Sequence, residues 1–356
     1  MVPYIFLVSS PFIFCIGTSL FVKKKKVKVG MLFVFFAFLC VLLSLRGMMV
    51  GVDTKNYFYF YEILSSCSFR EIFLEFSEEY GFYIFIWIIS NIFKNFQIVL
   101  TIVAIFFVFI PLFIIYKNET NHPILVVSVF ISLCPFAFYF SGISQITGMA
   151  FAVPVFYLIK NKKYVWSLLL ILFGITFHIS TITLLLLFPI MNFSFKKDYF
   201  LPMLAIVIAF FLFKNVIFTI ISSVISKYAT MYSNIENNGS YLMFLAYLFI
   251  FVALFIVPAK ETKRVFFARG LLFFMTCIQC MSPISHMIMR LNYYLLMFLP
   301  IAMSYFFDEK WILSKPIKKV VLLLFCGFFI AYFFFYGIDA DNLNINPYSP
   351  FWVSQF

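Results

Sequence analysis

Residues 23–46 read KKKKVKVGMLFVFFAFLCVLLSLR, in which a lysine run precedes an apolar stretch of bilayer-spanning length. Similar stretches recur along the chain, so that 64% of the 356 residues are hydrophobic and only 11% are charged. Soluble domains carry about 25% charged residues, and a soluble chain this apolar would expose large adhesive patches. Lipid removes that problem but forces the backbone to pair its own polar groups, and continuous apolar runs do so as helices. The sequence therefore predicts an all-α, polytopic transmembrane bundle.

We expect about 12 spans within a single integral membrane domain that covers residues 1–356. Their approximate ranges are 3–22, 29–49, 97–116, 123–140, 146–159, 164–177, 179–193, 200–221, 241–258, 265–282, 291–307 and 319–338. One further segment, 82–93 (FYIFIWIISNIF), is apolar but short for a span. It is better interpreted as a re-entrant or interfacial helix.

The distribution of basic residues predicts the orientation of these spans. Lysines gather in short loops such as 23–26 and 160–163, and such loops remain on the inner side of a membrane. With an external N-terminus, the long loop 50–96 and the polar loop 222–240 then lie outside. The formal net charge of +12 fits contact with anionic lipid headgroups. Nucleic acid is not an expected partner.

Polar and ionisable side chains close to spans are costly in lipid, which makes them candidates for function. In the predicted topology the candidates all reach the outer face; they are Arg46, Asp53, Gln145, His178, His286 and Arg290. Each also has a structural interpretation, as a snorkelling cation, a turn cap or a backbone hydrogen bond. The glutamates at 71–79 fit a solvated face. Three widely separated histidines do not indicate a metal site.

Arginine suits phosphate, because its planar fork of N–H donors stays charged at all working pH values. A histidine or carboxylate beside it could take a proton from an attacking sugar hydroxyl. The candidates are therefore compatible with chemistry on a lipid-linked diphosphate.

Several segments resemble, in order, the signatures of the EpsG-like, Wzy-type polysaccharide polymerases. They are LRGMMVGVDTKNYFYFYE (45–62), EEYGFYIFIWII (78–89), a middle segment that begins SGISQITGMAF (141–151) and ends in FHIS (177–180), MRLNYYL (289–295) and NPYSPFW (346–352). The resemblance covers most of the chain. It departs at Ser144, where the family often has arginine.

The resemblance implies a GT-C-like glycosyltransferase that joins undecaprenyl-diphosphate-linked repeat units into O-antigen or capsular polysaccharide. It places the site at the periplasmic face of the bacterial inner membrane, with a flippase and a chain-length regulator as partners and no cofactor or metal. Arg46 and Arg290 would hold diphosphate, with Gln145 and His286 as further substrate-binding candidates. His178 would be the base or its orienter, and Asp53 would position the acceptor or Arg46.

Other classes remain open at this point. A flippase for lipid-linked oligosaccharide fits the span count, although it predicts ionisable groups at the bilayer midplane and repeated halves. A membrane acyltransferase would need a histidine-based acyl-transfer site. An O-antigen ligase is a close enzymatic relative that the sequence barely separates from a polymerase.

Overall fold

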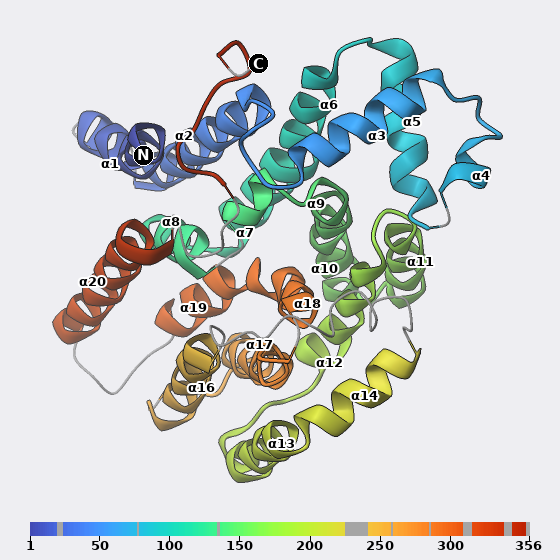
Figure 1. Cartoon of the computed structure of the whole chain (residues 1–356). Helices are drawn as coiled ribbons and strands as arrows, with labels where there is room; N and C mark the ends of the chain where they lie inside the picture. Colours follow the sequence, from blue (N-terminus) through green and yellow to red (C-terminus); the bar gives the residue numbers. More distant parts are fainter. Residues whose placement is uncertain are drawn as a thin grey trace. The chain divides into compact units, whose positions relative to one another are not determined.

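The computed structural model describes residues 1–19, 24–76, 78–133, 136–224, 241–257, 259–284, 286–308, 315–337 and 344–353. Throughout these residues the regular structure is helical (Figure 1), and an isolated β-bridge joins Arg46 to Pro350. The prediction of an all-α chain is therefore confirmed. Most of the outer loop predicted at 222–240 lies outside the described residues, which end at 224 and resume at 241.

The chain divides into two compact units, which are residues 1–182 with 322–356 (unit 1) and residues 183–321 (unit 2). The helices that begin in unit 1 are α1 (Val2–Ser19), α2 (Lys24–Leu45), α3 (Thr54–Ser66), α4 (Ile72–Glu75), α5 (Tyr80–Ile92), α6 (Phe96–Ile102), η1 (Val103–Phe109), α7 (Ile110–Glu119), α8 (Pro123–Leu133), η2 (Ala137–Phe140), α9 (Ile143–Ala150), α10 (Ala152–Lys160), α11 (Tyr164–Ile175), η3 (Ile179–Leu186) and η5 (Phe333–Gly337). Those that begin in unit 2 are α12 (Leu187–Asn192), η4 (Lys197–Tyr199), α13 (Phe200–Leu212), α14 (Lys214–Val224), α16 (Tyr241–Ile256), α17 (Lys263–Gln279), α18 (His286–Leu296), α19 (Leu299–Asp308) and α20 (Lys315–Tyr332).

Among the described residues, four helical stretches are long and apolar enough to cross a membrane, namely Lys25–Leu45, Phe96–Glu119, Ile143–Lys160 and Pro316–Phe335. A fifth would be the pair Lys197–Leu212 and Lys214–Ile220, which is bent by 73°. Shorter apolar helices lie in five of the other predicted spans, and α5 covers most of the segment at 82–93. The predicted span at 265–282 falls on α17, and the one at 291–307 is divided between α18 and α19. The chain is thus a helical membrane protein, and the number of about 12 spans stays a prediction.

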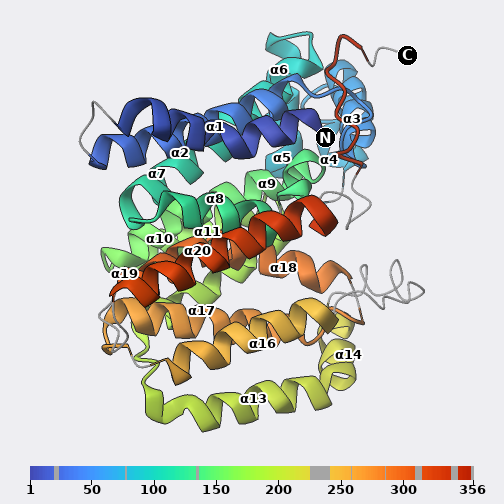
Figure 2. The same cartoon turned by 90° about the vertical axis from the view of Figure 1, so that its left-hand side faces the viewer.

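In unit 1, α2 is the helix that leads to the candidate site. Its buried side chains recur at helical spacing, as in Leu32, Phe35, Phe36 and Leu39, and face α6, η1, α7 and α8. On other faces Phe33 is 49% exposed, as a lipid-facing side chain would be. The helix α1 packs beside α2, and the two run antiparallel (Figure 2).

In unit 2, α17 is the central helix and packs against α12, α13, α16, α18 and α19. Most of its residues are buried, including the guanidinium of Arg269. That guanidinium donates from Nε to the Leu254 carbonyl (3.1 Å) and from Nη1 to the Phe195 carbonyl (3.2 Å) and to Glu261 Oε1 (2.8 Å). Its carbon also lies 4.5 Å from the centre of the Phe255 ring.

Candidate functional site

Arg46 follows the last residue of α2 and is only 2% exposed. Its Nη1 donates to the Leu43 carbonyl at 2.9 Å, whereas Nε and Nη2 are buried with no hydrogen-bond partner among the described residues. In the part of the chain that the structure describes, no carboxylate pairs with this cation. A buried charged donor left unpaired costs more than the roughly 1–3 kcal/mol of a neutral group. The arrangement therefore suits an anionic ligand that would accept from these N–H groups.

The segment 344–353 crosses over this arginine, and we call it the C-terminal strap. Its backbone bonds to both neighbours of Arg46, because Gly47 N–H donates to the Ser349 carbonyl (2.9 Å) and Phe351 N–H donates to the Leu45 carbonyl (2.9 Å). The Tyr348 hydroxyl donates to the Leu42 carbonyl at 2.9 Å. The strap thereby fixes the end of α2 from which the guanidinium projects.

Three tyrosines lie close enough to interact electrostatically with Arg46, namely Tyr4, Tyr57 and Tyr348. The Tyr4 hydroxyl donates to the Ile345 carbonyl of the strap at 2.5 Å. Burial raises the pKa of the Tyr57 phenol to about 12, although hydrogen bonds with Ser144 oppose that rise. At working pH this phenol is therefore neutral and can donate a hydrogen bond.

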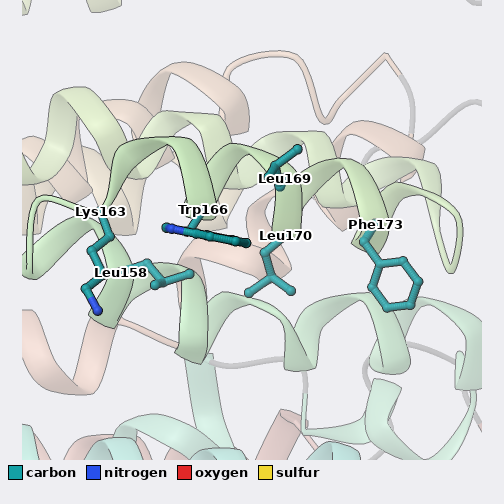
Figure 3. Close-up of a pocket in the computed structure, with 6 residues that line it drawn as sticks. All are labelled: Leu158, Lys163, Trp166, Leu169, Leu170 and Phe173. Carbon is teal, nitrogen blue, oxygen red and sulfur yellow. The ribbon is translucent and has the colours of Figure 1, made fainter.

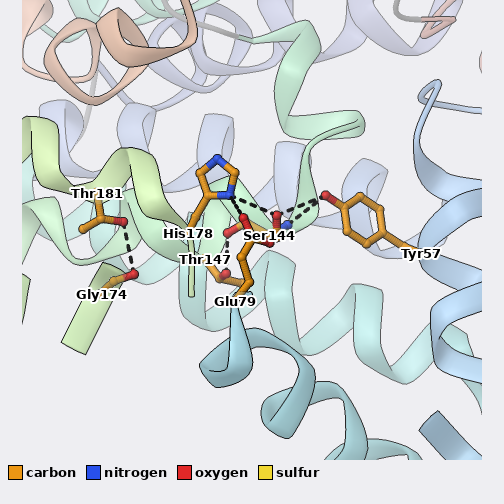
Figure 4. Close-up of polar contacts among 7 residues, drawn as sticks. All are labelled: Tyr57, Glu79, Ser144, Thr147, Gly174, His178 and Thr181. Atoms are coloured by element: carbon orange, nitrogen blue, oxygen red, sulfur yellow. Dashed lines mark hydrogen bonds and ion pairs between the residues drawn. The ribbon is translucent and has the colours of Figure 1, made fainter. Parts of the chain in front are cut away.

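His178 and Glu79 form a pair beside these groups, with Nδ1 and Oε1 2.5 Å apart (Figure 4). Nδ1 also lies 3.3 Å from Ser144 Oγ. A carboxylate at Nδ1 selects the tautomer with the proton on that nitrogen, so Nε2 becomes the basic atom. Figure 4 shows the second ring nitrogen pointing away from these contacts.

The local backbone explains how Glu79 reaches His178. Glu79 precedes α5 in the left-handed region (φ 56°), which costs a non-glycine residue roughly 1–2 kcal/mol. Two residues later, Gly81 N–H donates to the Thr176 carbonyl at 2.9 Å. A Cβ at Gly81 would lie 2.3 Å from Thr176 Oγ1, so only glycine allows α5 to approach this turn so closely.

Tyr57 interacts electrostatically with Arg46 and is hydrogen-bonded to Ser144, which in turn contacts His178. Ser144 N–H donates to the Tyr57 hydroxyl at 3.2 Å, and that hydroxyl lies 3.3 Å from Ser144 Oγ. Ser144 stands where the family pattern often has arginine. In this chain the position carries a short side chain that contacts both Tyr57 and His178.

Asp53 is held next to Ser141, which lies just before α9 and Ser144. Its N–H donates to Ser141 Oγ at 3.1 Å, and that hydroxyl donates to Asp53 Oδ2 at 3.0 Å. Gly51 (φ +86°) makes this approach possible, since a Cβ there would lie 1.8 Å from the Phe140 carbonyl oxygen. Gln145 is buried in α9, directly after Ser144.

Unit 1 thus brings together the regions of Arg46, Asp53, Gln145 and His178, whereas His286 and Arg290 lie in α18 of unit 2. Asn292, two residues after Arg290, donates from Nδ2 to the Met275 carbonyl and to Gln279 Oε1, both at 3.0 Å, and so fastens α18 to α17. Arg290 itself is half-buried. The functional roles of all six residues stay predictions.

One sequence-based expectation is wrong. The glutamates at 71–79 were expected to form a solvated face, and Glu71, Glu75 and Glu78 are exposed, but Glu79 is half-buried against His178. The signal that distinguishes it is the glycine two residues later, which permits the close approach of α5. Tyr57 carries no comparable signal, because tyrosines crowd the segment around it.

The site offers a buried cation with free donors, a histidine oriented by a carboxylate, and a neutral phenol that links them. These groups can bind an anionic leaving group and accept a proton next to it. Among known proteins, neither the curated sequences nor the solved structures contain a match to this chain. The sequence model described as the EpsG family matches residues 29–350, which is nearly the whole chain. The chain therefore belongs to the EpsG family, whose members are similar to Wzy-type polymerases.

Proposed function

We propose that the protein polymerises undecaprenyl-diphosphate-linked oligosaccharide repeat units into O-antigen or capsular polysaccharide. Family membership supports a polymerase-like role in membrane polysaccharide biosynthesis. The observation that carries the finer proposal is the buried Arg46 guanidinium, with Nε and Nη2 unpaired among the described residues. A diphosphate leaving group would accept hydrogen bonds from both nitrogens and neutralise the charge.

The reaction assigns one task to each part of the site. A hydroxyl oxygen of the acceptor sugar forms a bond to the anomeric carbon of the donor, and the bond from that carbon to the diphosphate oxygen breaks. His178 Nε2 takes the hydroxyl proton, while Nδ1–H donates to Glu79. Arg46 stabilises the negative charge that develops on the departing undecaprenyl diphosphate.

A periplasmic site in the bacterial inner membrane, within a GT-C-like bundle of about 12 spans, is part of the same proposal. Its support is the pattern of basic loops. Lys160 ends the helical stretch Ile143–Lys160 and is followed by Lys162 and Lys163, whereas Ser144 lies at the opposite end of that stretch. Because lysine-rich loops stay inside, Ser144 and its contacts would face outward. A flippase would deliver the substrate to that face, and a chain-length regulator would act there as well.

The experiment that tests the proposal is gel analysis of surface polysaccharide from a deletion strain. If the proposal holds, deletion leaves a single repeat unit on its acceptor, and the wild-type gene restores the ladder. Loss of every repeat unit, including the single one, would favour the flippase. Full-length polymer that accumulates on undecaprenyl diphosphate would favour the ligase.

The same strain tests the prediction that Arg290 contacts diphosphate. Arg290→Ala should leave protein in the membrane and abolish the ladder, whereas Arg290→Lys keeps the charge and should retain part of it. Ladders of normal length from the alanine variant would remove Arg290 from the site and leave the proposal for Arg46 and His178 intact.

A further inference from the structure

Unit 1 has a second candidate binding region. It lies at the other ends of the helices that lead to the candidate functional site. Arg46 follows the last residue of α2, and Lys24 begins it 22 residues earlier, which is about 33 Å along a helix. The α9–α10 stretch likewise runs from the neighbourhood of Ser144 to Lys160. Lys160 pairs with Glu119 at the end of α7 (2.7 Å), and the Lys28 ammonium donates to the Thr120 carbonyl. We call this region the lysine end of unit 1.

A groove of about 430 Å³ lies along α11 where α11 leaves the lysine end (Figure 3). It is lined by Leu158, Lys163, Trp166, Leu169, Leu170 and Phe173. The apolar side chains are open to the surroundings, since Trp166 is 64% exposed and Phe173 is 54% exposed. The groove therefore has a cationic beginning and a long apolar wall.

Lys163 is available to a ligand in this groove. It is exposed, and the structure assigns its ammonium no partner within the described part of the chain. Its backbone is fixed, because Lys163 N–H donates to the Leu158 carbonyl at 2.8 Å. Trp166, one turn later, is the side-chain type that settles at the boundary between headgroups and acyl chains. Lysine and tryptophan together thus locate the groove at that boundary.

A second groove at the lysine end repeats this composition. It measures about 420 Å³, and its lining includes Lys25 and Lys26 together with Phe14, Phe33 and Phe113. Both grooves therefore combine cations at the end of a helix with exposed aromatic and aliphatic walls. The charge and the apolar length complement an amphiphile that carries a negative headgroup and an acyl chain.

We propose that the groove beside Lys163 and Trp166 is a binding site for an anionic phospholipid of the inner leaflet. The lipid phosphate pairs with the Lys163 ammonium, and one acyl chain lies against Leu169 and Phe173. This site is separate from the polymerisation site, and only its assignment to the inner leaflet rests on the orientation given under the proposed function. Each lysine near an anionic surface strengthens binding by roughly fivefold.

The test uses the fluorescence of Trp166 as a probe inside the groove. The full chain, with Trp87, Trp311 and Trp352 replaced by phenylalanine, is placed in phosphatidylcholine vesicles that contain an equal fraction of either brominated phosphatidylglycerol or brominated phosphatidylcholine. A brominated lipid quenches the fluorescence of the indole only when it is in contact with that side chain. We expect an apparent affinity for the anionic quencher roughly fivefold higher than for the zwitterionic one.

Matched variants then locate the charge. Lys163→Gln should abolish the preference for phosphatidylglycerol, Lys163→Arg should restore it, and Lys55→Gln should leave it unchanged because Lys55 lies on α3 near the site. Equal quenching by the two lipids in the parent protein would overturn the proposal. So would a preference that survives Lys163→Gln, or one that Lys55→Gln removes equally well.

Discussion

The molecule contains two buried arginines whose surroundings differ in kind. Arg46 in unit 1 is 2% exposed, and its guanidinium donates one hydrogen bond, to the Leu43 carbonyl, while Nε and Nη2 have no partner among the described residues. Arg269 in unit 2 is 1% exposed but donates to two carbonyls and to Glu261, and it stacks over Phe255. The two arginines are therefore almost equally buried, and they differ in how many of their guanidinium donors have hydrogen-bond partners.

The difference teaches that burial of a charge does not by itself indicate function. A cation whose donors are satisfied by its own chain is part of the folded scaffold. Removal of one partner leaves the remaining groups buried without a counterpart, which destabilises the fold. A buried cation with unsatisfied donors carries a desolvation cost, and a ligand that accepts hydrogen bonds from those donors can offset it. Arg46 belongs to the second kind and Arg269 to the first.

The largest expected effect is on catalysis, from Arg46→Gln. Removal of the ligand-binding charge should lower polymer synthesis by roughly 100- to 1,000-fold, as loss of a donor to a developing anion does. The amount of protein in the membrane should stay near the wild-type level, because the guanidinium has one hydrogen bond to a described residue, the Leu43 carbonyl, and no described carboxylate loses a cation. Ladder analysis and immunoblotting of membranes measure the two quantities. If the variant is absent from the membrane, Arg46 would be a structural arginine like Arg269.

Arg269→Gln should show the opposite pattern. Loss of the donors to Phe195, Leu254 and Glu261 should lower the free energy of unfolding by about 3 kcal/mol. The abundance and thermal stability of the purified protein report this loss. Polymer formed per folded molecule should remain near the wild-type value. A fully folded variant that makes no polymer would contradict the conclusion that Arg269 is structural.

A third change tests whether the Glu79 carboxylate acts through His178. Glu79→Gln should lower synthesis by about 100-fold, because the amide no longer selects the proton position on His178. The double variant with His178→Ala should be no worse than His178→Ala alone, since the two residues act as one unit. Fully multiplicative losses would show that Glu79 acts elsewhere.

A smaller effect is expected from the strap. Tyr348→Phe removes the hydrogen bond to the Leu42 carbonyl and should weaken the cover of Arg46 by about 1 kcal/mol. We expect a several-fold loss of polymer at unchanged membrane abundance. Tyr59→Phe, at an exposed position of α3, is the matched control and should behave as wild type.

The smallest effect concerns the pH dependence of unit 2. Burial raises the pKa of the Glu261 carboxyl, but hydrogen bonds from Arg269 and the Lys197 N–H outweigh it and hold the pKa below its ordinary 4.5. A carboxyl whose pKa is lower in the folded than in the unfolded protein stabilises the fold at pH values above its unfolded pKa. This stabilisation is lost as the pH falls through the folded pKa. Glu261→Gln should therefore cost less than about 1 kcal/mol at pH 7, because this carboxylate is partly exposed. Thermal unfolding should show the wild type and the variant converging below pH 4.5.

Sequence patterns predicted the helices well, because a continuous apolar run in lipid leaves the backbone no alternative. They also singled out Arg46, which ends such a run. They could not predict Glu79, whose pairing depends on a left-handed backbone and on Gly81 meeting a turn about 95 residues later. Arg269 escaped notice for a related reason, since its carbonyl partners come from other helices and loops. A single domain over residues 1–356 stays a prediction.

The strap has a consequence for the order in which the protein is made. Tyr348 and its acceptor Leu42 are 306 residues apart. At translation rates of about 5–20 residues per second, Arg46 emerges roughly 15–60 s before the segment that covers it. During that interval the nascent chain must keep a cation solvated at the end of α2. The strap can therefore bond to the end of α2 only after the intervening helices have been made.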